Sequence, residues 1–145
     1  MLHQATEMEK EFILTKAADS LNEGMNKKPG ISKEKAEELL TSVLNSGAYY
    51  LVHCNEEEEI QGWALIGENM DYISEKKVGF IFDLHVLTEH RGKGLSKVLI
   101  KESVNELKNK GYSEVRLNVY ASNFAKDVYK RLGFSELQSI MYLKV

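Results

Sequence analysis

The stretch His90-Arg91-Gly92-Lys93-Gly94-Leu95-Ser96 separates two segments whose apolar residues follow different periods. Before it, residues 79–87 are mostly apolar, which is typical of a buried strand. After it, apolar residues recur three or four positions apart up to residue 110, which predicts an amphipathic helix. A glycine turn that leads from a strand into a helix exposes backbone N–H groups at the positive end of the helix dipole. The stretch therefore predicts an anion site, best suited to phosphate or pyrophosphate.

Two common nucleotide-binding motifs do not fit this turn. The dinucleotide fingerprint requires a third Gly or Ala at position 97, which is Lys97, and an acidic residue at the end of the next strand, whereas Glu114 begins that strand. The P-loop pattern of Gly, four residues and Gly-Lys-Ser/Thr occurs nowhere in the chain. On the turn alone, a phosphate site and a plain glycine-rich connection both remain open.

The pattern of the whole chain predicts one α/β domain over residues 1–145. Strands are expected at residues 2–5, 48–55, 60–67, 79–87, 115–119 and 137–145, and helices at residues 7–23, 32–45, 93–110 and 122–132. The strand–helix–strand crossover through residues 79–119 makes those two strands parallel, while residues 48–67 form an antiparallel hairpin. We therefore expect a mixed sheet with helices on both faces.

Composition excludes several classes of function. The net charge of −3, from 19 basic and 22 acidic residues, argues against nucleic-acid binding. No apolar run approaches the roughly 20 residues of a membrane span, and the N-terminus resembles neither a signal nor a transit peptide. The single cysteine, Cys54, agrees with a reducing compartment, so a cytoplasmic location is expected. The four histidines lack metal-ligand spacing, so no metal is expected.

Two motifs at the right separation resemble the GNAT N-acetyltransferase superfamily. That family's signature is Arg or Gln, two residues, Gly, one residue, then Gly or Ala; here the matching residues are Arg91, Gly94 and Ser96, of which Ser96 departs from the pattern. Downstream, the family's Asn…Ala…Tyr…Gly-Phe pattern is matched by Asn123, Ala125, Tyr129, Gly133 and Phe134. The resemblance is strongest over residues 80–134.

The resemblance implies an acyl-CoA-dependent N-acyltransferase that uses acetyl-CoA as cosubstrate. In this family the donor lies between two parallel strands that splay apart, so the backbone of Leu84, His85 and Val86 would pair with the pantetheine arm. The pyrophosphate would be held by the N–H groups of Arg91, Gly92, Lys93, Gly94, Leu95 and Ser96. Asn123 would hydrogen-bond the pantetheine, and Tyr129 would contact the donor and protonate the leaving thiolate.

The residues leave the general base open. A lysine-like amine is almost fully protonated at pH 7, and reaching its neutral form costs roughly 4.6 kcal/mol. Some family members carry a glutamate where this chain has Phe82. Asp83 and His85 are the adjacent polar candidates, and strand alternation places them on the face opposite Phe82. An amine of low pKa would need no strong base.

The expected function is transfer of an acetyl group from acetyl-CoA to a primary amine by direct attack. The acceptor is expected to be a small-molecule or peptide amine, and a homodimer is one expected assembly. One alternative is a non-catalytic CoA-binding or small-molecule-sensing module, suggested by the missing glutamate at Phe82. Another is a phosphate-binding domain for a different nucleotide.

Overall fold

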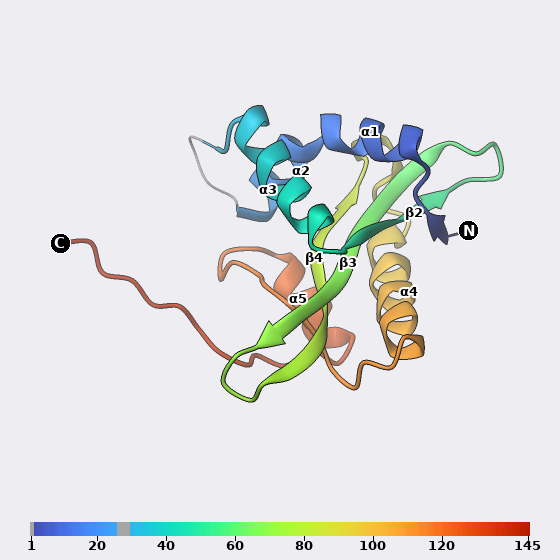
Figure 1. Cartoon of the computed structure of the whole chain (residues 1–145). Coiled ribbons are helices and arrows are strands. Elements are labelled where there is room, and N and C mark those ends of the chain that lie inside the picture. The colour runs from blue at the N-terminus through green and yellow to red at the C-terminus, as the bar shows by residue number, and fades with distance from the viewer. Residues whose placement is uncertain (1, 26–29) are drawn as a thin grey trace.

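A computed structural model of the chain describes residues 2–25 and 30–145 (Figure 1). One five-stranded sheet holds the structure together, with the strand order β1-β2-β3-β4-β5. Along the chain the elements are β1 (Leu2–Gln4), α1 (Glu7–Thr15), α2 (Ala17–Met25), α3 (Lys33–Asn45), β2 (Tyr49–Cys54), β3 (Ile60–Asp71), β4 (Lys76–Val86), a 3₁₀ turn (Thr88–His90), α4 (Leu95–Asn109), β5 (Val115–Leu117) and α5 (Ala125–Arg131).

The sheet is mixed, as the sequence predicts. Strands β1 to β4 pair antiparallel with their neighbours, and β5 pairs parallel to β4 through residues 79–81 and 115–117. The helix α4 is the crossover between these two parallel strands, because it joins them along the chain. Of the described helices, none is long and apolar enough to cross a membrane.

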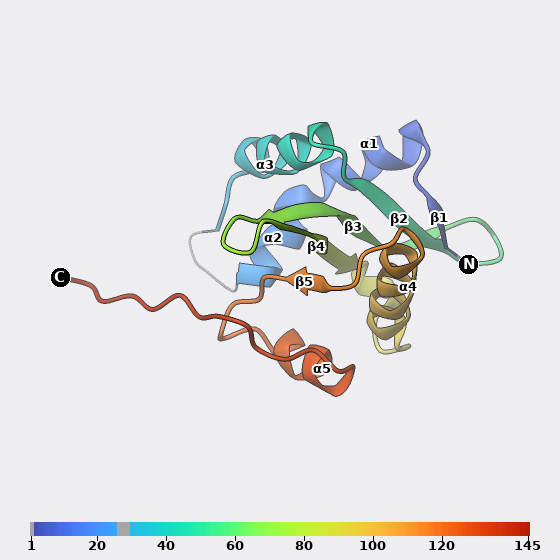
Figure 2. The ribbon, with the colours of Figure 1, turned by 60° about the horizontal axis from the view of Figure 1, so that its bottom comes forward.

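Helices cover both faces of the sheet (Figures 1 and 2). On one face, α1, α2 and α3 pack against a core that includes Ile13, Tyr50 and Trp63, all of them 1% exposed or less. On the other face, Leu107 of α4 packs against Ile66 and Ile81. The predicted α/β class, with helices on both faces of a mixed sheet, is confirmed.

The expected helix over residues 7–23 is two helices. The backbone leaves the α-helical conformation at Lys16, whose φ is −101° and ψ is 7°. Ile13 before the break and Ala17 after it are both buried, so the change of direction lets two short helices follow the curved sheet. It also brings Ser20 of α2 to β4, where its hydroxyl donates to Asp83.

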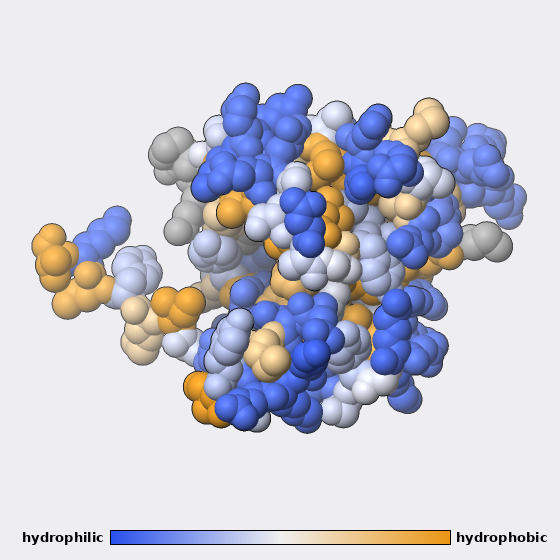
Figure 3. Space-filling view, in the orientation of Figure 1, coloured by the Kyte–Doolittle hydropathy of each residue, from blue (hydrophilic) through white to orange (hydrophobic). Residues whose placement is uncertain are grey.

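The expected strand over residues 137–145 is wrong for the isolated chain. These residues follow α5 as an extended tail that pairs with no strand of the chain and projects away from the body (Figures 1 and 2). Apolar side chains are strung along the tail in the space-filling view (Figure 3). The period-two pattern is present, but a strand requires a neighbour, and no edge of the chain's own sheet lies beside the tail.

Candidate functional site

The two parallel strands of the sheet separate at the place where an extended ligand arm could enter. Pairing between β4 and β5 ends at Ile81 and Leu117, whereas β4 continues to Val86. On the side facing β5, the backbone of residues 82–86 therefore lacks a strand partner within the described chain. Leu84, His85 and Val86 all lie on this open stretch, as the sequence predicts.

A β-bulge in β4 accompanies this separation. Leu65 of β3 pairs with Asp83 and the next residue, Ile66, pairs with Ile81, so Phe82 has no partner on β3. A bulge bends its strand and interrupts the alternation of side chains. Phe82 packs on the core beneath α1, α2 and α3, and Asp83 bonds to Ser20 on that same face. The prediction that Asp83 and His85 lie opposite Phe82 is wrong, because alternation does not continue through the bulge.

The turn before α4 has the conformation that glycine permits. Gly92 and Gly94 have φ angles of 79° and 76°, in the left-handed region that residues with a Cβ rarely adopt. Gly94 caps the helix, and the N–H of Val98 makes the first intrahelical bond, to the Gly94 carbonyl, at 3.3 Å. The N–H groups of residues 95–97 therefore have no partner within the helix. These N–H groups lie where the sequence predicts an anion cradle, and Lys93 lies exposed beside them.

Arg91 holds the turn in place with its side chain. Its Nε donates to the Val86 carbonyl at 2.9 Å, and one terminal nitrogen donates to both carboxylate oxygens of Glu23 at 2.7 and 2.8 Å. One guanidinium thus joins the end of β4, the turn and α2. The contribution of Glu23 has no local signal in the sequence, because it stands 68 positions before Arg91.

A hollow of about 320 Å³ connects the cradle with the open end of β4. Its lining includes most of the residues predicted to bind the donor: Leu84, His85, Val86, Arg91, Gly92, Gly94, Leu95 and Ser96. Glu23 and His90 complete it. Strands β3 and β4 approach closely beside Gly62, and this approach requires glycine at that position. A Cβ there would lie 2.7 Å from the His85 carbonyl oxygen.

A second hollow of about 500 Å³ adjoins the first, and both are lined by Glu23 and His85. It lies between α1, α2 and the segment after β4, where its other lining residues are Phe12, Lys16, Asp19, Asn22, Leu87, Thr88 and Glu89. Its charged groups apart from His85 are three carboxylates and one ammonium, a net charge of −2. This hollow is therefore suited to a cationic ligand.

His85 lies at the boundary of the two hollows. Its ring stacks on Trp63 at a centroid distance of 5.1 Å, and its Nδ1 is 3.4 Å from Glu23 Oε2. The side chain is 6% exposed, and this burial lowers the pKa of the imidazole despite the opposing effect of Glu23. His85 is consequently neutral near pH 7, with Nδ1 turned toward a carboxylate.

Asp83 lies deeper and lines neither hollow. Burial raises the pKa of Asp83 to about 6, although the hydroxyl of Ser20 donates to Oδ1 at 2.6 Å and lowers it. The other oxygen, Oδ2, is buried with no hydrogen-bond partner in the described part of the chain; the same holds for Tyr50 Oη and Trp63 Nε1. The two predicted candidates for the base therefore differ in access, since only His85 reaches a cavity.

Two predicted site residues lie on or beside α5. The ring of Tyr129 packs edge-on against Phe134 at 5.8 Å. Burial, with a further effect of Asp83, raises the pKa of Tyr129, so its hydroxyl retains the proton at neutral pH. Asn123 Oδ1 accepts the N–H of Ala125 at 2.9 Å, which orders the start of α5. Neither residue lines the two hollows.

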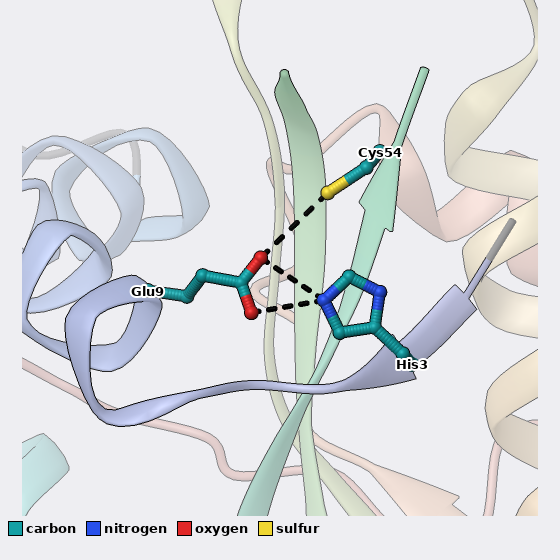
Figure 4. Close-up of side chains that lie close together, drawn as sticks. All are labelled: His3, Glu9 and Cys54. Carbon is teal, nitrogen blue, oxygen red and sulfur yellow. Dashed lines mark hydrogen bonds and ion pairs between the residues drawn. The ribbon is translucent and has the colours of Figure 1, made fainter. Parts of the chain in front are cut away.

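A separate cluster joins β1, α1 and β2 (Figure 4). His3 Nε2 lies 2.9 and 3.0 Å from the two carboxylate oxygens of Glu9, and the Cys54 thiol donates to Glu9 at 3.7 Å. The sequence did not indicate this group of possible metal ligands, whose atoms lie within 4.8 Å of one another. Glu9 also closes a capping box with Thr6 at the start of α1. These bonds give the cluster a structural role, which is to fix α1 on the sheet.

The turn before α4, the open strand edge and the mixed sheet agree with the fold that the sequence resemblance implies. The family model described as an acetyltransferase (GNAT) domain matches residues 16–143. The chain therefore belongs to the GNAT acetyltransferase family.

Curated relatives and solved structures agree with this assignment. The [ribosomal protein bS18]-alanine N-acetyltransferase of Haemophilus influenzae is 30% identical over 94 residues, which are 64% of this chain and 60% of that protein. The thialysine N-epsilon-acetyltransferase of Bos taurus is 33% identical over 84 residues, 54% of this chain and 49% of that protein. The matches thus span only about half to three fifths of these relatives.

Among solved structures, a putative acetyl transferase from Pyrococcus furiosus superposes with a TM-score of 0.82, at 25% identity, over 100% of this chain and 99% of that one. An aminoglycoside N-acetyltransferase in complex with CoA superposes with a TM-score of 0.73, at 19% identity, over 100% and 93%. The second likeness concerns the fold alone.

Proposed function

We propose that this chain transfers the acetyl group of acetyl-CoA to a primary amine whose carrier is cationic. The observation that carries the proposal is the meeting of two hollows at Glu23 and His85. The first combines an anion cradle with an open strand edge, which suits the pyrophosphate and the amide-containing arm of CoA. The second is acidic and reaches the same two side chains, so it suits the acceptor.

The donor is held mainly by backbone groups. The N–H groups at the start of α4 bind the pyrophosphate, and the open edge of β4 from Leu84 to Val86 pairs with the amides of the pantetheine arm. A backbone N–H near Val86 polarises the thioester carbonyl as its oxygen gains charge. Bound acetyl-CoA supplies an activated acyl group with a thiolate leaving group. Arg91 serves as a positioning residue, since its side chain is occupied by Val86 and Glu23.

The acceptor is selected by charge. Glu23 is paired with Arg91, so Asp19 and Glu89 face the single ammonium of Lys16 in the second hollow, which leaves a net charge of −1. A polyamine, a lysine-containing peptide or another amine with an additional positive charge would balance this charge. Neutral and anionic amines would bind there without this favourable electrostatic interaction. The shallow, open position of the hollow between α1 and α2 admits an acceptor that extends into solvent.

His85 is the proposed general base, and Asp83 is not. The carboxylate of Glu23 near Nδ1 favours the tautomer that carries its proton there, so Nε2 is free to accept one. The amine nitrogen attacks the thioester carbon, the C–S bond breaks, and the amine's proton passes to His85. The departing thiolate takes a proton from the Tyr129 hydroxyl, whose raised pKa keeps it protonated beforehand.

Release of free thiol from acetyl-CoA tests the proposal directly. The acceptors should include spermidine, a lysine peptide, an uncharged hydroxylamine-type amine and an amino acid with a free carboxylate. Faster turnover of the cationic acceptors supports the proposal. A double variant, Asp19→Asn with Glu89→Gln, should then lower kcat/KM for these acceptors at least tenfold. Tight CoA binding with no turnover across the panel would instead establish the non-catalytic binding module.

A further inference from the structure

One cluster of side chains with metal-ligand chemistry lies outside both hollows and takes no part in the proposed reaction (Figure 4). It is formed by His3, Glu9 and Cys54, which come from β1, α1 and β2. The imidazole nitrogen, a carboxylate oxygen and the sulfur all lie within 4.8 Å of one another. Nitrogen, oxygen and sulfur of these residue types are the atoms that bind zinc in proteins. The cluster therefore has the donor set of a zinc site.

Backbone pairing brings His3 and Cys54 to the same face of the sheet. His3 lies opposite Val52 in the antiparallel pair of β1 and β2. Residues directly opposite each other on neighbouring strands present their side chains to one face. Val52 and Cys54 both belong to the core beneath α1, α2 and α3, so the side chain of His3 lies on this face as well. Two of the three ligands thus stand at fixed positions on neighbouring strands.

The third ligand, Glu9, is oriented by the capping box at the start of α1. The Thr6 N–H donates to Glu9 Oε1 at 2.9 Å, and the Glu9 N–H donates to the Thr6 hydroxyl at 3.2 Å. Burial opposes ionisation of Glu9, but the bonds from Thr6 and His3 outweigh it and lower the pKa of this carboxyl. The carboxylate is therefore charged at neutral pH, and a hydrogen bond from an outer residue fixes its direction, as is usual for metal ligands.

The distances between the donor atoms are close to those of a tetrahedral zinc site. With bonds of about 2.0 to 2.3 Å at tetrahedral angles, the donor atoms of such a site lie about 3.3 to 3.6 Å apart. Here His3 Nε2 lies 2.9 and 3.0 Å from the two Glu9 oxygens, and Cys54 Sγ lies 3.7 Å from Oε2. An ion would need side-chain shifts of a few tenths of an ångström to about 1 Å, which the exposed His3 ring can supply.

Access and charge also suit a divalent cation. The side chain of His3 is 43% exposed, so a water molecule can complete the coordination from that side, whereas Cys54 is buried on the other. Burial and the nearby Glu9 raise the pKa of the Cys54 thiol, which therefore keeps its proton until an ion displaces it. The resulting thiolate and the Glu9 carboxylate together carry the two negative charges that a divalent ion neutralises.

We propose that His3, Glu9 and Cys54 bind one zinc ion, with water as the fourth ligand. Coordination replaces the direct bonds within the cluster, and the thiol proton passes to solvent. The ion ties the start of α1 to β1 and β2. The ligands stand 6 and 45 positions apart, which is not the spacing of a zinc motif, so the sequence alone gives no indication of the site. The inference is independent of the reaction proposed above.

Zinc titration of the metal-free full chain against a chromophoric chelator tests the site at neutral pH. We expect one zinc ion per chain, and a Kd raised by about a hundredfold or more in His3→Gln and in Cys54→Ser. His53→Gln is the matched control, because it removes the histidine next to Cys54, whose Nδ1 bonds to Gln61. This variant should change the Kd less than threefold. A wild type that binds no zinc, a His3→Gln variant of equal affinity, or a control as weak as His3→Gln overturns the proposal.

Cobalt reports on the thiolate directly, because Co²⁺ occupies zinc sites and its bond to sulfur gives a charge-transfer band in the near ultraviolet. The wild type should show this band, Cys54→Ser should lack it, and added zinc should remove it. Zinc should also raise the Tm of the wild type, since it binds the folded chain, and should leave the Tm of His3→Gln unchanged. A cobalt complex without the band, or equal thermal shifts in the two proteins, contradicts the assignment.

Discussion

Replacing Asp83 with asparagine should stabilise this protein at neutral pH. The carboxylate is buried between α2 and β4, and burial raises its pKa from the ordinary 3.8 to about 6 despite the bond from Ser20. An ionised carboxylate is thus disfavoured in the folded state relative to the unfolded state. The difference between the two pKa values means that ionisation of Asp83 lowers the unfolding free energy by about 3 kcal/mol above pH 6.

The sign of the pH dependence follows from the same values. Below about pH 4, Asp83 is protonated in both the folded and the unfolded chain, so it does not affect stability there. As the pH rises from 4 to 6, the unfolded chain loses its proton first, and the folded state loses stability relative to it. Asparagine retains an oxygen that accepts from Ser20 and never ionises, so its advantage should appear over this interval and persist above pH 6.

Urea unfolding of both proteins at pH 4, 5, 6 and 8 is the assay. Asp83→Asn should gain up to about 3 kcal/mol at pH 8 and little at pH 4, with the upper limit reduced by burial of the new amide NH₂. A variant that is less stable than wild type at pH 8 would refute the reasoning. Acetyl transfer should persist in this variant, and a hundredfold loss of kcat/KM would make Asp83 the base in place of His85.

Four further changes probe other parts of the structure. Tyr129→Phe should lower kcat at least tenfold while leaving the Kd for CoA nearly unchanged, which single-turnover and binding measurements separate. Arg91→Ala should weaken CoA binding about tenfold by calorimetry, and Arg91→Lys should recover little, because the fork to Val86 and Glu23 is lost in both. Thr6→Ala should lower the unfolding free energy in urea by about 1 kcal/mol through loss of the cap on α1. Deletion of Phe82 should abolish CoA binding by removing the bulge, whereas Phe82→Ala, which preserves the residue count, should retain it.

The sequence predicted those features that depend on residues close together in the chain. The anion cradle follows from Gly92 and Gly94 between a strand and a helix, because positive φ angles and a helix start are local properties. The parallel pairing of β4 with β5 follows from the crossover rule. The start of α3 is local as well, because Ser32 is a residue type that caps helices and its hydroxyl accepts the N–H of Lys35 at 3.1 Å.

Features that depend on distant residues were not predictable in this way. Glu23 lines both hollows, but no pattern near it indicates a partner 68 positions away. The cluster of His3, Glu9 and Cys54 joins three elements whose spacing has no regular period. The tail has the pattern of a strand, yet that pattern specifies a need for a neighbour without saying which chain provides it.

The bulge at Phe82 has the largest consequence among the features that were missed. With uninterrupted alternation, Phe82 and Asp83 would lie on opposite faces; the extra residue brings both beneath α1, α2 and α3. His85, two residues further, then lies on this same face, between Trp63 and Glu23, where the two hollows meet. The bulge also falls directly after the last residue that pairs with β5, where the strands separate. A single extra residue in β4 thus accounts for the direction of the proposed base, and it lies where β4 separates from β5.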